Sequence, residues 1–92
     1  MDHIKLIEET ALRLLADGEF HDLTHELDAF FVVELELCRQ RCEALGKEYK
    51  NVRSIRKHGK RLLIQDALEA LPSDRVVRKD SGGVTLYKKF SP

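Results

Sequence analysis

The sequence predicts a mainly helical α+β domain, with three helices followed by a C-terminal β-hairpin. Apolar residues recur at three- and four-residue intervals over most of residues 2–71, which is the spacing of helices that bury one face. Residues 75–90 instead hold two β-rich runs separated by DSGG at 80–83, a strong signal for a hairpin turn. A chain of 92 residues is too short for two hydrophobic cores, so we expect one domain over residues 1–92.

The first and third helices are predicted over residues 2–16 and 51–71. The first ends before Gly18, a natural helix stop, and the third is ended by Pro72. Gly59 in the middle of the third costs roughly 1 kcal/mol relative to Ala, so the sequence leaves open whether this segment is one helix or two. The apolar stripe of the first helix is formed by Ile4, Ile7, Ala11 and Leu14.

The segment between these two helices has two interpretations. A helix is favoured because a four-three spacing of apolar residues persists through CRQRCEAL, where strand-like alternation fails. The run FVVELEL also alternates as a half-buried strand does, so the state of residues 29–38 stays open. As a helix, residues 27–45 present a seam suited to a second copy, which predicts a homodimer through Phe31, Leu35, Cys38, Cys42 and Leu45.

The hairpin is predicted with Lys79 opposite Val84, which sorts its side chains onto two faces. The more apolar face is expected to lie on the core and contains Val77, Val84, Leu86 and Phe90. The other face is expected to point away from the core and contains Val76, Arg78, Thr85 and Tyr87.

Charge is divided unevenly along the chain, although the formal net charge is zero. Residues 1–45 carry 11 acidic and 4 basic side chains, whereas residues 46–92 carry 12 basic and 5 acidic ones. The stretch KEYKNVRSIRKHGKR at 47–61 holds seven Lys or Arg against one acid. On a helix several of these bases share one side, where they repel each other unless a polyanion such as phosphate neutralises them. We therefore expect a negatively charged partner for this region.

The stretch ALEALPSDRVVRKDSGGVTLYKKF looks like the end of a recognition helix that runs into a wing. Residues 1–90 also follow the order helix, helix, helix, hairpin, and in both respects the sequence resembles the winged helix-turn-helix class of DNA-binding proteins. The resemblance implies a winged-helix-like fold, with the third helix in the major groove of duplex DNA and the hairpin near the backbone or minor groove. It also implies a role in regulating transcription.

The residues predicted to bind DNA come from the third helix, the turn before it and the hairpin: Lys50, Arg53, Arg56, Lys57, Lys60, Arg61, Arg78 and Lys79. An alternative is a protein-interaction module whose charge-polarised surface docks on another protein, as in adaptors, antitoxins and phage-encoded inhibitors. A solvated helix face is the plainest explanation of a basic stripe, and the sequence leaves these possibilities open.

Neither catalysis nor a metal or other cofactor is expected, because the sequence has no Gly-rich phosphate loop and no recognisable nucleophile motif. His25 and Cys38 would lie about 20 Å apart on one helix, too far to bind a single metal ion. The two cysteines fall short of a disulfide framework, and there is no leader-like segment or long apolar run. We therefore expect a cytoplasmic protein that does not span a membrane.

Overall fold

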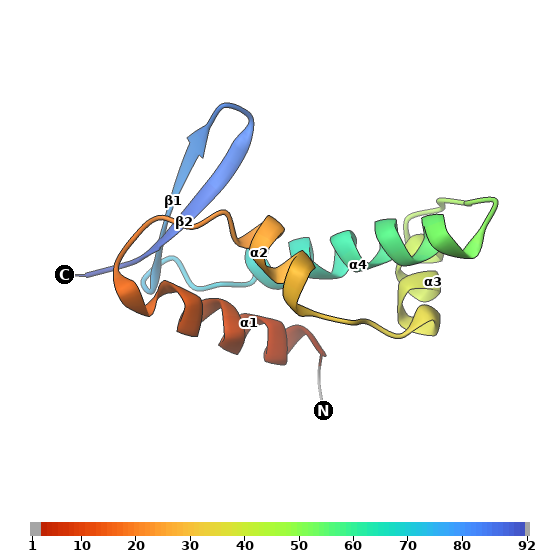
Figure 1. Ribbon diagram of the computed structural model, residues 1–92, viewed down its shortest axis with the longest axis horizontal. Coiled ribbons are helices and arrows are strands. Elements are labelled where there is room, and N and C mark those ends of the chain that lie inside the picture. The colour runs from red at the N-terminus through yellow and green to blue at the C-terminus, as the bar shows by residue number, and fades with distance from the viewer. Residues whose placement is uncertain (1–2, 92) are drawn as a thin grey trace.

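The computed structural model describes residues 3–91, and its longest helix, α4, connects the two ends of an elongated molecule (Figure 1). The domain is mainly helical with a C-terminal antiparallel hairpin, as predicted, but this range contains four α-helices rather than three. None of these helices is both long and apolar enough to cross a membrane. The elements are α1 (His3–Leu14), the 3-10 turn η1 (Leu15–Asp17), α2 (Leu23–Phe30), α3 (Leu35–Ala44), α4 (Val52–Glu69), β1 (Val76–Ser81) and β2 (Val84–Lys89).

The hydrophobic core lies where α1 and α2 pack on the C-terminal half of α4. Burying each large aliphatic side chain there contributes about 1.5–3 kcal/mol relative to leaving it in water. The first predicted helix is confirmed over His3–Leu14, while residue 2 lies outside the described residues. The helix gives way to η1 before Gly18, whose φ of 78° suits a residue without a side chain. The core residues from α1, η1, α2, α4 and the turn after α4 are Ile7, Ala11, Leu15, Leu23, Leu27, Ile64, Ala67, Leu68 and Leu71.

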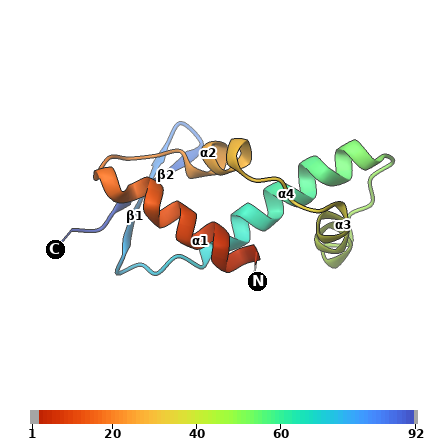
Figure 2. The same cartoon turned by 60° about the horizontal axis from the view of Figure 1, so that its bottom comes forward.

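The single helix predicted over residues 27–45 is wrong, because the chain is extended between α2 and α3. Phe31 has φ −102° and ψ 138°, and Glu34 has φ −60° and ψ 141°. The two β-branched residues between them, Val32 and Val33, favour extended backbone, and Val33 is buried. This link of residues 31–34 lets α3 change direction and pack on α4 of the same chain, as Figure 2 shows.

α4 is one continuous helix that passes through Gly59, so the open question about residues 51–71 is resolved in favour of one helix. Asn51 caps its start by accepting a hydrogen bond from the backbone N–H of Ser54 at 2.9 Å. Gly59 is needed where α3 crosses, because a Cβ added there would lie 2.5 Å from the backbone Cα and carbonyl oxygen of Cys38. The absence of a side chain at Gly59 therefore sets how closely α3 can approach α4.

An ion pair and two buried thiols strengthen the same contact between α3 and α4. The guanidinium of Arg41 donates to Asp66 with an Nη2–Oδ1 distance of 2.8 Å. Hydrogen bonding to the Asp66 carboxylate raises the pKa of Arg41. Cys38 and Cys42 are buried, with the Cys42 thiol 4.0 Å from the backbone carbonyl oxygen of Ile55.

The hairpin register differs from the predicted one by two residues. Ser81 pairs with Val84 and Lys79 with Leu86, so the turn consists of Gly82 and Gly83 alone. Their φ values of 57° and 82° fit a two-residue turn of type I′, in which both central residues need positive φ. Because the shift is an even number of residues, the predicted grouping of side chains on the two faces is kept.

The prediction of which face of the hairpin lies on the core is wrong. Val76 and Tyr87 belong to the core cluster, while Val77, Val84 and Phe90 are exposed. The contact between β2 and the turn that joins α1 to α2 determines which face of the hairpin is buried. Backbone hydrogen bonds of 2.7 and 2.9 Å join Tyr87 to His21, which forms an isolated third-strand bridge and holds Tyr87 over the core.

His21 also ties the turn between α1 and α2 together through its side chain. Its Nε2 lies 2.9 Å from Asp17 Oδ1, and its Nδ1 lies 2.9 Å from Glu26 Oε1. Both nitrogens can donate only when the ring is protonated. The hydrogen bonds to Asp17 and then to Glu26 accordingly raise the pKa of His21.

We predict that Gly59→Ala destabilises the protein even though alanine is the better helix former. Propensity alone favours alanine by about 1 kcal/mol. The close contact with the Cys38 backbone opposes this gain, and overpacking of such a site typically costs about 1–3 kcal/mol. Urea unfolding measures the difference, with exposed Gln65→Ala in the same helix as the control. A gain in stability for Gly59→Ala would show that α3 does not approach α4 this closely.

We predict that the free energy of unfolding decreases as pH rises through the raised pKa of folded His21. A raised folded pKa means that the stabilisation is fully present below the unfolded value of about 6.5 and is lost above the folded value. His21→Gln should flatten this part of the pH profile, measured by urea unfolding between about pH 6 and 9. Exposed His25→Gln should retain the slope, and a flat profile in the parent protein would contradict the prediction.

Candidate nucleic-acid interface

The candidate site lies on the N-terminal half of α4, where a buried stripe of the helix becomes basic. Ile64, Ala67 and Leu68 face the core under α1 and α2. The same three- and four-residue steps, followed towards the start of the helix, lead to Lys60, Lys57 and Arg53. One side of α4 therefore serves the core at its C-terminal end and presents cations at its N-terminal end.

These cations line a groove of about 350 Å³ between α4 and the link of residues 31–34. Four basic residues come from α4, and three apolar residues come from the link. Asp28 is the only carboxylate that lines the groove among the described residues. We call this cavity the α4 groove; it is lined by Asp28, Phe31, Val32, Val33, Arg53, Arg56, Lys57 and Lys60.

Asp28 neutralises the groove only in part. Lys60 donates to the backbone carbonyl of Asp28, and its Nζ lies 3.8 Å from the Asp28 carboxylate. The Asp28 side chain is 60% exposed, so this ion pair contributes little to stability. Arg53, Arg56 and Lys57 are exposed to solvent. Three positive side chains therefore remain available to an incoming anion.

Two apolar side chains in or next to the link are unusually exposed. Val32 on the wall of the groove is 89% exposed, and its neighbour Phe30 is 69% exposed. Phe31 lies between these two residues in sequence. Its side chain is half-buried and packs against the core. The link thus presents an apolar surface directly opposite the basic side of α4.

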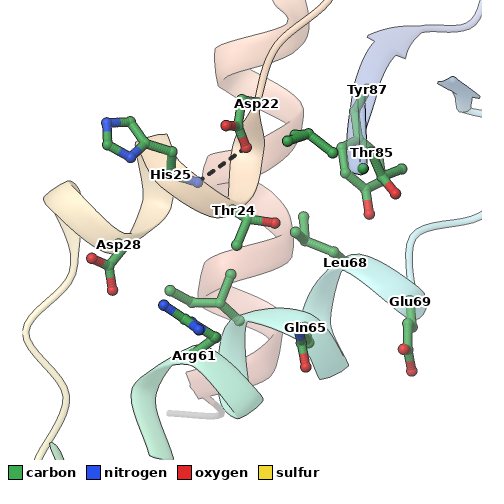
Figure 3. A pocket seen from close by; sticks show the side chains of 13 residues that line it. Asp22, Thr24, His25, Asp28, Arg61, Gln65, Leu68, Glu69, Thr85 and Tyr87 are labelled. Carbon is green, nitrogen blue, oxygen red and sulfur yellow. Dashed lines mark hydrogen bonds between the residues drawn. The ribbon is translucent and has the colours of Figure 1, made fainter. Parts of the chain in front are cut away.

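Arg61 faces a different hollow, of about 540 Å³, between α2, α4 and the hairpin (Figure 3). Figure 3 shows the carboxylates of Asp22, Asp28 and Glu69 among the side chains that line it. Asp22 also caps α2 by accepting from the backbone N–H of His25 at 3.3 Å. With three carboxylates around one guanidinium, this hollow has the wrong charge for a phosphate backbone.

Arg78 makes a structural contact that the sequence did not indicate. Its guanidinium donates to the backbone carbonyls of Leu68 and Leu71 at 3.1 and 2.9 Å, and it lies 5.7 Å from the Tyr87 ring centroid. The last turn of α4 has no basic residue of its own, so Arg78 supplies the positive charge that the carbonyl end of a helix favours.

Two other residues predicted to bind DNA, Lys50 and Lys79, do not line the groove either. Lys79 lies on the hairpin face opposite to Arg78, with its Nζ 5.5 Å from the ring centroid of Phe20. Arg53 lies roughly 24 Å along the helix axis from Glu69 at the hairpin end of α4. Lys50 is exposed in the turn before Asn51. The structure thus brings together four of the eight predicted contact residues and separates the other four.

The predicted dimer seam does not form a continuous exposed surface. Cys38 and Cys42 are buried against α4 of their own chain, and Phe31 packs on the core. Leu45 is the most exposed of the five, at 47%. The five residues cannot together contact a second copy in this fold, and dimerisation through any other surface stays a prediction.

The thiols and imidazoles do not form a metal site within the described residues. Burial raises the pKa of the Cys38 thiol, which favours its protonated, unreactive form. Tyr49 stacks on His58 with ring centroids 4.6 Å apart, so its ring already has a partner within the chain. The expectation that the protein is not an enzyme stays a prediction.

No protein-family model, curated protein or solved structure matches the chain.

Proposed function

We propose that the protein is a winged-helix-like domain that binds DNA through the basic N-terminal half of α4, as a regulator of transcription. The observation that carries the proposal is the clustering of four cations along one groove with a single carboxylate. Cations three and four residues apart on a helix repel each other, and phosphates relieve this repulsion as they release counterions.

The arrangement of the elements supports the winged-helix comparison. α1 and α2 pack on α4, the hairpin follows α4 directly, and the His21 bridge adds a third strand position beside β2. α3, between α2 and α4, is one helix more than the order helix, helix, helix, hairpin contains. In helix-turn-helix proteins the N-terminal residues of the recognition helix reach the bases, which is the part of α4 that is basic here.

A second candidate is a module that binds an acidic, partly apolar segment of another protein. The exposure of Val32 and Phe30 favours it, because apolar side chains gain nothing from contact with phosphates. The two candidates differ in how their binding responds to salt. Phosphate binding by several cations falls steeply with salt, whereas a packed apolar interface is less sensitive.

We predict that the protein retards a generic duplex in a mobility-shift assay at low salt. If the three available cations each neutralise one phosphate, the affinity should fall roughly fortyfold between 50 and 200 mM salt. Arg53→Ala and Lys57→Ala should each weaken binding and reduce the salt slope by about one.

Two further variants make the assay specific to the α4 groove. Arg13→Ala removes the same charge from an exposed position on α1 and should leave the affinity unchanged. Lys79→Ala tests the hairpin and should have little effect, because Lys79 lies near the Phe20 ring and does not line the groove. No retardation at low salt would refute DNA binding and favour the acidic protein segment.

A further inference from the structure

The two walls of the α4 groove differ in chemistry. The α4 wall consists of Arg53, Arg56, Lys57 and Lys60, and the opposite wall consists of Phe31–Val33. A ligand that satisfies both walls must carry negative charge on one edge and apolar groups on the other.

Duplex DNA satisfies only the basic wall. Its phosphates lie on the outside and its bases are stacked within, so the link of residues 31–34 would face phosphates and sugars. An unpaired strand offers both edges, because its phosphates can follow the cations while its splayed bases contact the apolar wall. Proteins that bind single strands combine a positively charged groove with aromatic side chains in the same way.

The described geometry also offers ring surfaces for stacking. Phe31 lines the groove, and its ring centroid lies 6.2 Å from that of Phe30, with the planes inclined at 56°. Phe30 precedes the groove residue Phe31 and is 69% exposed at the end of α2, so its ring can accept a base without any change in the core. Val32, which is 89% exposed, adds apolar contact beside the rings.

We propose that the α4 groove binds unpaired nucleotides, with phosphates on Arg53, Arg56 and Lys57 and bases against Phe30, Phe31 and Val32. This inference rests on the proposed function, because it names which form of nucleic acid the groove selects. The groove volume of about 350 Å³ is at the lower end of the roughly 300–1,000 Å³ of small-ligand pockets.

The test compares fluorescein-labelled 12-nucleotide oligothymidine with a labelled 12-base-pair duplex, by fluorescence anisotropy at one low salt concentration. The expected result is tighter binding of the single strand, by about tenfold. Loss of one base–aromatic contact typically weakens binding about fivefold or more. Phe30→Ala should therefore weaken binding of the single strand. Val32→Ser should also weaken it by removing apolar contact, and both variants should leave the duplex affinity within about twofold.

A matched control is Leu45→Ser, which removes a half-exposed apolar side chain at the end of α3, outside the groove. It should leave both affinities unchanged, and thermal unfolding of every variant checks that the fold is kept. Equal or tighter binding of the duplex would overturn this inference and leave the proposed function standing. Binding of neither oligonucleotide would overturn both. Binding only of a labelled peptide of alternating Glu and Leu would assign the groove to a protein ligand.

Discussion

The close approach of α3 to α4 at Gly59 is the contact on which the candidate site depends. It fixes α3 against one side of the N-terminal half of α4, with the Cys38 backbone where a side chain would otherwise lie. The Arg41–Asp66 ion pair holds the same two helices. Because α3 is held there, the link of residues 31–34 that leads into it runs beside the basic side of α4, and the two together line the groove.

α4 combines stabilising and binding roles in its two halves. The C-terminal half is surrounded by α1, α2 and the hairpin, and its end is capped by Arg78. The N-terminal half concentrates positive charge on the side that α3 leaves uncovered. Repulsion among those cations lowers helix stability by a few tenths of a kcal/mol per pair, a cost that the packed half and α3 can offset. Like charge is therefore kept together where it can act on a ligand.

Local features of the sequence explain what could be predicted. The apolar spacing before Gly18, the long helix ended near Pro72 and the Gly82-Gly83 turn each depend on neighbouring residues, and the corresponding elements form. The break after Phe30 could not be read in this way, because helical spacing continues through Cys38 and Cys42. Locally only Val32 and Val33 favour extended backbone, and the close packing of the Cys38 backbone against Gly59, from a distant part of the sequence, favours two helices. The hairpin faces were grouped correctly, but both contain apolar residues, and the bridge to His21 decides which one is buried.

The candidate site was predicted in part for the same reason. The spacing of four bases in the sequence places them on one side of α4. The wall opposite them depends on the tertiary fold. The only feature of the sequence that indicated this wall was the Val32-Val33 pair. The most direct test of the account is to titrate ¹⁵N-labelled protein with the oligothymidine and follow backbone amide shifts by NMR. The account predicts that changes concentrate in residues 28–33 and 53–60 and spare β1 and β2. Changes centred on the hairpin and the hollow around Arg61, with none along the groove, would contradict it.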